Sequence, residues 1–365
     1  MGEILESIVF YCMICIALLY FAMKIDAKKN VRFFICILIL TLTLVSGLRH
    51  ETVGIDTQGY VNLISMLRDG YLVNLNNISE QGFISLSYIL VNVSEGYTLA
   101  LIVYAFITNA LIVLRLYDYK DRISFTWAIF VYYMVFYFST FNTIRQWLAI
   151  AIIFYGTRYI ENNVKSIIKY MIFILLAVSM HTTAIFAILF MPLYYFSIPS
   201  RKLSDLLRKF VMIIFACLAG IYIYVTIVNK YSIYITSSIY GDISWVNIVL
   251  LLFMSVSILY DNYWKSVICQ NRTKTNYNGS TNIKYESLVF FTGIVFSLMV
   301  FLTKYADRVG RYFLLFEIIW FAYYIKKART RTITIIFVII LCTYLRFSSF
   351  LMSGFGEVPY IPFWD

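Results

Sequence analysis

Ionisable side chains in this sequence gather where the chain leaves apolar segments, although only 13% of its residues are charged. The stretch SGLRHETVGIDTQGY, residues 46–60, follows the apolar run FFICILILTLTLV and contains Arg49 and Asp56. Arginine offers a fixed fork of donors that suits phosphate, whereas a carboxylate or a histidine can take the proton of a hydroxyl. These residue types indicate a site for an anionic ligand with hydroxyl groups. The other candidates are Thr57, Tyr60, Glu80, Arg145, Gln146, His181, Arg308, Arg311 and Tyr312.

Simpler interpretations stay open for several of these residues. Arg49 and Arg311 can extend to lipid headgroups without binding a ligand. Asp56 can act as the N-cap of a helix over DTQGYVNLISMLRDG, because aspartate is favoured at that position. His181, in SMHTTA, can be a turn residue between two apolar segments.

Composition identifies the class of protein that must position these residues. The chain has 365 residues, is 61% hydrophobic and contains repeated apolar runs. Each run is about 15 to 20 residues long, near the length that crosses a bilayer core of about 30 Å. Backbone groups in lipid must be bonded internally, so these segments should be helices. We therefore expect an all-α, polytopic integral membrane protein with about 12 spanning helices, forming a single transmembrane domain over 1–365.

One further apolar stretch, 83–93, is too short to cross the membrane. As a helix its residues would rise only about 16 Å, so we expect a helix that lies in the membrane interface. The predicted spans cover 4–23, 33–48, 97–114, 124–139, 145–160, 167–181, 182–196, 210–228, 245–260, 286–302, 309–325 and 332–347.

Lysine and arginine are distributed unevenly between the predicted loops. With the loop from Lys24 to Arg32 placed inside, the inside loops hold 22 of the 30 basic residues and the outside segments hold 8. The positive-inside rule then places both termini and the candidate residues outside. This topology predicts an outer loop over 49–96 and a mobile cytoplasmic loop over 261–285. The net charge of +11 reflects this topology, and no nucleic-acid partner is expected.

The cysteines give no indication of a metal site. Of the six cysteines, five lie inside predicted spans, where cysteine behaves as a small hydrophobic residue. No spacing of cysteine and histidine matches a zinc motif, so neither a metal nor another cofactor is expected.

Five short motifs, taken together and in order, resemble the EpsG family of membrane proteins. They are GLR…VGIDTQGY, EQGF, TIRQW, MHTTA and DRVGRYF, and they extend from Gly47 to Phe313. The C-terminal EVPYIP is similar to the usual end of family members, whereas Gln81 stands where the family frequently has proline. The family is similar to the Wzy-type polymerases of O-antigen and exopolysaccharide assembly. The resemblance implies an architecture like that of GT-C glycosyltransferases.

The resemblance also implies a reaction. Such enzymes transfer a growing glycan from polyprenyl pyrophosphate to a lipid-linked repeat unit at the outer face of the cytoplasmic membrane, without a nucleotide sugar. The expected partners are that lipid-linked oligosaccharide, membrane lipid and a protein that regulates chain length. Donor binding would also involve Thr57, Tyr60, Gln146 and Tyr312.

The candidate residues fit roles in that reaction. The leaving pyrophosphate needs preorganised cations, for which the candidates are Arg145, Arg308 and Arg311. His181 is the first candidate for the base, because the ordinary pKa of histidine is near 6.5. Asp56 and Glu80 are the alternatives for the base. Arg49 either pairs with Asp56 or binds the donor phosphate.

Two other functions stay open. ADRVGR resembles a loop motif of major-facilitator transporters, but there the motif is cytoplasmic, and here the charge distribution places it outside. A flippase for lipid-linked oligosaccharide is a related possibility. An O-antigen ligase would also use outer arginine and histidine, but it usually carries them in one large late loop. The largest outer loop here, 49–82, comes early.

Overall fold

The structure is a computed structural model. It describes residues 2–70, 80–94, 96–198, 248–249, 253, 283–299, 304–327, 331–351 and 356–364. These residues form helices joined by turns, and the only bridge of β type within them joins Arg49 to Pro362. The chain divides into two compact units, Met1–Ala187 with Glu317–Asp365, and Ile188–Phe316.

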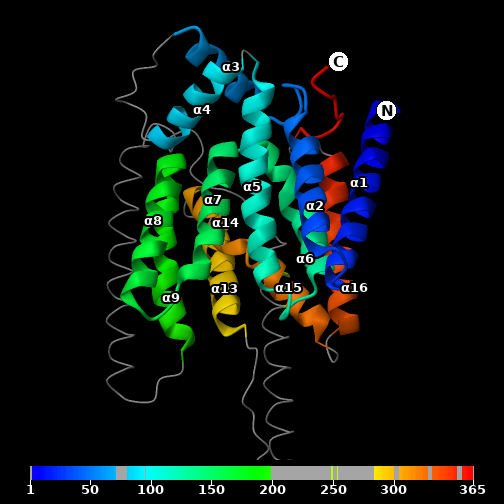
Figure 1. The fold of residues 1–365 in the computed structure, drawn as a ribbon. Coiled ribbons are helices and arrows are strands. Elements are labelled where there is room, and N and C mark those ends of the chain that lie inside the picture. The colour runs from blue at the N-terminus through cyan, green and yellow to red at the C-terminus, as the bar shows by residue number, and fades with distance from the viewer. Residues whose placement is uncertain are drawn as a thin grey trace, which may run out of the picture. The chain divides into compact units, whose positions relative to one another are not determined.

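The first unit contains most of the described helices. Figure 1 shows α1, α2 and α5 running alongside one another in this unit. Its α-helices are α1 Gly2–Asp26, α2 Val31–Gly47, α3 Thr57–Arg68, α4 Gln81–Val93, α5 Thr98–Asp118, α6 Phe125–Val131, α7 Ile144–Gly156, α8 Val164–Met180, α15 Glu317–Lys326 and α16 Arg331–Leu351. A π-helical turn over Tyr132–Phe136 and a 3-10 turn over Tyr137–Phe141 continue α6, and a further 3-10 helix over Thr182–Leu189 follows α8.

The lengths and apolar character of these helices identify a membrane protein. Among the described residues, α1, α5 and α16 are long and apolar enough to cross a membrane. Shorter apolar helices cover Val31–Gly47, Gln81–Val93, Phe125–Phe141 and Thr182–Ser197. The predicted helical segments from 4–23 to 182–196 therefore correspond to helices.

Some sequence predictions lie outside the described residues. The predicted span 210–228 lies there, as do nearly all of the span 245–260 and of the cytoplasmic loop 261–285. The number of spans, the GT-C architecture, the outer position of loop 49–96 and the interfacial position of 83–93 therefore stay predictions. The structure does give 83–93 as a helix, since it lies within α4.

The second unit contains α9 Phe190–Ser197, α13 Lys284–Leu298 and α14 Lys304–Leu314. A Cβ atom added at Gly293 would lie 2.7 Å from the backbone nitrogen of Leu314, so glycine is what permits the close contact of α13 with α14. The predicted span 309–325 is interrupted in the structure, because α14 ends at Leu314 and α15 begins at Glu317. The turn between them places the rings of Phe313 and Phe316 against Phe190, at centroid distances of 4.5 and 5.6 Å.

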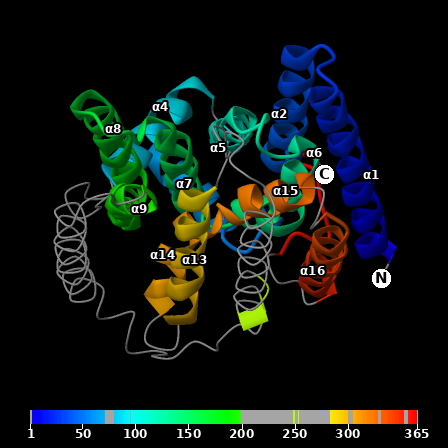
Figure 2. The same ribbon diagram turned by 90° about the horizontal axis from the view of Figure 1, so that it is seen from below.

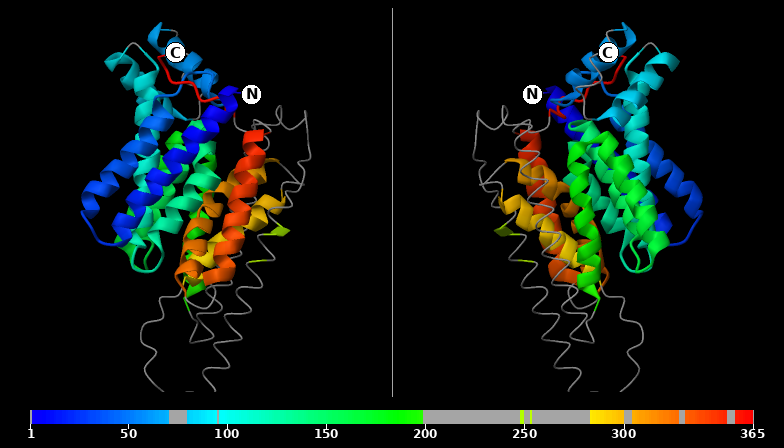
Figure 3. Two further views of the ribbon diagram at one scale, coloured as in Figure 1. Left: turned by 90° about the vertical axis from the view of Figure 1, so that its right-hand side faces the viewer. Right: turned by 90° about the vertical axis from the view of Figure 1, so that its left-hand side faces the viewer.

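The C-terminal segment, residues 356–364, packs on the first unit. Figure 3 shows this segment in red, close to the blue segment that follows α2. Its main chain bonds that of the segment after α2 at three points, from His50 N to Ile361 O (2.8 Å), from Gly54 N to Gly356 O (2.8 Å) and from Phe363 N to Leu48 O (2.9 Å). Two parts of the first unit that are distant in sequence are thereby joined, namely the segment that follows α2 and the C-terminal segment.

Candidate functional site

A single carboxylate joins three segments of the first unit. Glu80 precedes α4, and its side chain is 6% exposed. One oxygen, Oε2, lies 2.5 Å from NH1 of Arg145 on α7. The other, Oε1, lies 2.5 Å from Nδ1 of His181 and accepts a longer bond from the backbone N–H of Thr182 at 3.4 Å. We call Glu80, Arg145 and His181 the Glu80 cluster.

The close contact between α4 and α8 places Glu80 beside His181. Figure 2 shows α4, α7 and α8 as neighbours in the first unit. A Cβ atom added at Gly82 would lie 2.8 Å from Cβ of Ser179 and 3.1 Å from its carbonyl oxygen. Only glycine therefore allows the first turn of α4 to approach the last turn of α8 this closely.

His181 is oriented by the end of α8. Its backbone is extended (φ −155°, ψ 123°), so the helix stops there, and its N–H still bonds the carbonyl of Ala177 at 2.8 Å. The next segment begins with a bond from Ala184 N to the carbonyl of His181 at 3.0 Å. His181 therefore lies at the turn between two helical segments, as the sequence indicates.

The charges of the cluster determine which histidine nitrogen carries the proton. Burial alone would raise the pKa of Glu80, but the hydrogen bond and charge of His181 and the charge of Arg145 outweigh it and lower this pKa. The carboxylate is therefore ionised and can only accept, so Nδ1 of His181 carries a proton. In the neutral ring, the form that a base requires, Nε2 then has the lone pair, whereas in the imidazolium, whose charge lowers the pKa of Glu80, Nε2 carries a proton. Nε2 is buried and has no hydrogen-bond partner among the described residues. A buried polar atom without a partner is rare and calls for an explanation such as catalysis.

Arg145 is the accessible cation of the cluster. Its side chain is 39% exposed, and its guanidinium carbon lies 5.9 Å from the ring centres of both Tyr60 and Phe83. It is the second residue of α7, a position that the helix dipole makes unfavourable for a positive charge. A cation at the N-terminus of a helix adds to backbone N–H groups that already favour anions. The arrangement therefore suits a phosphate group.

Arg49 has a different environment from the one predicted. It is 1% exposed, and it donates to the carbonyls of Val53 at 3.2 Å, Phe141 at 2.9 Å and, through NH1, Ser46. The predicted alternative of a pair with Asp56 is wrong, because these carbonyls take its donors. Thr57 is fully buried beside it and donates to the carbonyl of Val53 at 2.7 Å.

Asp56 takes the N-cap position of α3, as predicted, but its side chain makes no cap bond to that helix. The predicted position is therefore confirmed, and the expected capping bond is absent. Oδ2 instead accepts from the backbone N–H of Thr143 at 3.0 Å, and its own N–H donates to Oδ1 of Asn142 at 3.0 Å. Asp56 is therefore bonded to the two residues that precede α7.

The remaining candidates divide between the two units. Tyr60 and Gln146 are buried in the first unit, at 9% and 2% exposure. The others lie on α14 of the second unit, where Arg308 is exposed, Arg311 pairs with Asp307 at 3.0 Å and Tyr312 is buried. Their convergence with Arg145 stays a prediction. Gly82, Asn142 and Thr143 are not among the predicted site residues, although each lies inside or beside EQGF or TIRQW.

The chemistry of the cluster is that of charge and proton transfer. Within the described residues, no group of three or more His, Cys, Asp and Glu side chains could hold a metal ion. An ionised carboxylate orients an imidazole, and an arginine lies on the same carboxylate. This arrangement can take a proton from a hydroxyl and stabilise a nearby anion.

Comparison with known proteins gives one positive result. The family profile described as the EpsG family matches residues 32–362, which is most of the chain. No curated protein and no solved structure matches it significantly.

Proposed function

The chain belongs to the EpsG family, and from this premise we propose that it is a polysaccharide polymerase acting on polyprenyl-pyrophosphate-linked glycans. The donor would be the growing glycan on its polyprenyl pyrophosphate, and the acceptor a hydroxyl of a lipid-linked repeat unit. The protein would reside in the bacterial cytoplasmic membrane. The excess of basic residues in the predicted inside loops supports a site that faces outside.

The observation that carries this proposal is the position of Glu80 between His181 and Arg145. Glycosyl transfer needs a base for the acceptor hydroxyl and a cation for the departing pyrophosphate. Glu80 orients His181, the proposed base, and also binds Arg145, the proposed cation, so both lie beside the same carboxylate. Nε2 is buried and lacks a partner among the residues that the structure describes, so we infer that it is the atom that an acceptor hydroxyl would meet.

The proposed reaction begins with the acceptor hydroxyl at Nε2 of His181. As its oxygen bonds the anomeric carbon of the donor glycan, the proton passes to Nε2. The bond from that carbon to the pyrophosphate oxygen breaks, and the leaving group keeps the electron pair. Arg145 stabilises the negative charge that develops there, and Glu80 stabilises the imidazolium, as carboxylates do in hydrolase triads. Arg308 and Arg311 would also offset the negative charge of the pyrophosphate.

This reaction needs no metal ion, because arginines supply the electrostatic stabilisation. Activity of the purified protein in chelator tests this part of the proposal. Activity that falls in chelator and returns with a divalent ion would contradict it.

A gene deletion distinguishes the polymerase from the alternatives. In the host without this gene, surface polysaccharide should migrate as a single repeat unit, and the wild-type gene should restore the ladder. Full-length chains that never reach lipid A would identify a ligase instead. Loss of every surface repeat unit would identify a flippase.

A further inference from the structure

We propose that Asp56 is a positioning residue. Residues 46–57, which include Asp56, and the C-terminal segment 356–364 form a clamp. This clamp fixes the start of α7 and thereby the position of Arg145. The role of Arg145 rests on the proposed function, but the clamp itself does not. In this role Asp56 only accepts a hydrogen bond from the main chain and does not take a proton from the substrate.

The first step of the argument is the contact between the clamp and the residues before α7. Three consecutive residues before α7, 141–143, each make a hydrogen bond to Arg49 or Asp56 of the clamp. Arg49 bonds the carbonyl of Phe141 at 2.9 Å, Asn142 accepts from Asp56 N at 3.0 Å, and Thr143 N donates to Asp56 Oδ2 at 3.0 Å. Arg145 follows two residues later, so its place depends on this turn.

The backbone of Thr143 gives the second step. It has φ 37° and ψ 42°, in the left-handed region that residues with a side chain rarely adopt. Such a conformation persists only where surrounding contacts impose it, and residues in such conformations cluster at functional sites. The bond from Thr143 N to Asp56 is one of the contacts that impose it here.

The third step is what holds the Asp56 loop itself. Gly54 N donates to the carbonyl of Gly356 at 2.8 Å, next to the two further main-chain bonds that join His50 and Leu48 to the C-terminal segment. Both glycines have positive φ, 96° at Gly54 and 66° at Gly356, so the two turns fit each other through conformations that suit glycine.

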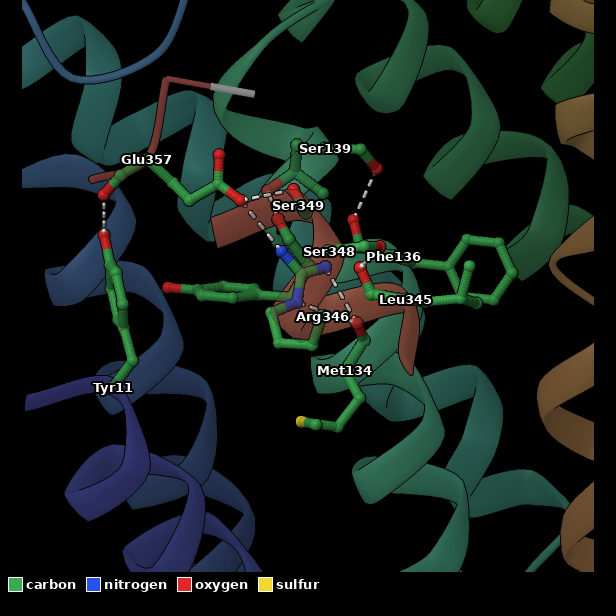
Figure 4. A network of polar contacts seen from close by, with 11 residues as sticks. Tyr11, Met134, Phe136, Ser139, Leu345, Arg346, Ser348, Ser349 and Glu357 are labelled. Carbon is green, nitrogen blue, oxygen red and sulfur yellow. Dashed lines mark hydrogen bonds and ion pairs between the residues drawn. The ribbon is translucent and has the colours of Figure 1, made fainter. Parts of the chain in front are cut away.

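The C-terminal segment is anchored in turn by a buried ion pair. Figure 4 shows Glu357 facing Arg346 of α16, with the two groups 3.1 Å apart and their side chains 0% and 4% exposed. Ser349 donates to the same carboxylate at 2.7 Å, and Tyr11 of α1 donates to the carbonyl of Glu357 at 2.7 Å. These contacts thus connect α1 and α16 to the turn before Arg145.

The positioning role and a role as base predict opposite effects of one substitution. Asp56→Asn keeps an oxygen that accepts from Thr143 N but removes the ionised carboxylate. A positioning residue tolerates this change, with polymerisation reduced by no more than about fivefold. A base does not, because an amide cannot take the proton.

The experiment compares Asp56→Asn and Asp56→Ala in the purified full-length protein. Hydrogen exchange of the amides of residues 141–148 reports the clamp without any substrate, and repeat-unit ladders at low and high donor concentration report its effect. We expect Asp56→Asn to keep wild-type protection. Asp56→Ala should lose protection and about 100-fold in activity at both donor concentrations, because a misplaced Arg145 no longer stabilises the departing pyrophosphate.

Thr143→Gly in the Asp56→Ala protein should restore part of the activity, because glycine adopts the left-handed conformation without help. Asp69→Ala is the control, since Asp69 is exposed and its carboxylate pairs with the adjacent Arg68.

Unchanged protection in Asp56→Ala would overturn the clamp. An inactive Asp56→Asn with wild-type protection would overturn the positioning role and restore the base. A wild-type protein that makes no ladder would overturn the proposed function, and the exchange result would still decide the clamp.

Discussion

His181 donates from Nδ1 to Oε1 of Glu80 at 2.5 Å, across 101 positions of sequence. Because the same carboxylate bonds Arg145 through its other oxygen, a change at Glu80 alters both neighbours at once. Loss of the carboxylate would free the ring of His181 to take the other tautomer and leave Arg145 without its partner. The relationship therefore makes Glu80 the residue whose replacement is most informative.

Glu80→Gln should leave a protein that inserts normally but polymerises poorly. The amide has the shape of the carboxylate but cannot stabilise an imidazolium, so we expect a rate loss of at least about 100-fold. Repeat-unit ladders at matched membrane expression measure the loss. Glu3→Gln is the matched control, because the carboxylate of Glu3 is exposed near the N-terminus of α1. A wild-type ladder from Glu80→Gln would remove Glu80 from the mechanism.

Glu80 should also give the protein a stability term that depends on pH. The pKa of this group is lowered in the folded protein, so its ionised form stabilises the fold. That contribution is complete above the unfolded pKa, about 4.3, and is lost as the pH falls through the lower folded pKa. Thermal unfolding of wild type and Glu80→Gln should therefore differ by a constant amount from pH 7 to about 5, and the difference should shrink below. A difference that shrank already between pH 7 and 6 would mean that the pKa is raised.

Gly82 should be intolerant of even a methyl group. In Gly82→Ala the new carbon would lie 2.8 Å from Cβ of Ser179 and closer still to its hydroxyl, so α4 and α8 must separate and the bond from Glu80 to His181 must lengthen. We expect a loss of stability of about 1–3 kcal/mol together with lost polymerisation.

Gly59→Ala is the matched control for Gly82→Ala, because nothing lies within 4 Å of a Cβ atom there. Gly59 is inside α3, where alanine should stabilise by about 0.5–1 kcal/mol. Thermal unfolding of both variants in detergent measures the contrast, and equal behaviour of the two would contradict the close contact of α4 with α8.

The sequence indicates the helices of this protein well because apolar length and charge placement are local signals. It also indicates His181, Glu80 and Arg145 as candidate site residues, since each stands at the end of an apolar segment. Their contacts could not be predicted, because Glu80 and His181 meet only through the packing of α4 on α8.

Asp56 illustrates the limit of local reasoning. Its position before Thr57 favours a helix cap, a preference that depends on a few neighbouring residues. A long-range bond to Thr143 prevails instead, and no spacing in the sequence reveals it. For Arg49 the sequence leaves open lipid headgroups, Asp56 and the donor phosphate, and in the structure its guanidinium donates to main-chain carbonyls.

The arginines proposed to bind the donor pyrophosphate provide the last prediction. Arg145 is half-buried on Glu80 and Arg308 is exposed on α14, so either could extend to lipid headgroups instead. Lysine serves equally well for that purpose, because both side chains are long and cationic. It does not serve for bidentate phosphate recognition, since it has no fork of donors.

Arg145→Lys and Arg308→Lys should therefore insert normally and lose most polymerisation. Loss of such a transition-state contact costs about 3–4 kcal/mol, or about 100- to 1000-fold in rate. Ladders from each variant at matched expression measure this, and a lysine at 145 can still approach Glu80, so the fold around it should persist. Arg68→Lys is the control, because Arg68 is exposed and pairs with Asp69 at the end of α3. Wild-type ladders from both variants would end the phosphate assignment, and the proposed mechanism would then lack the groups that stabilise the leaving pyrophosphate.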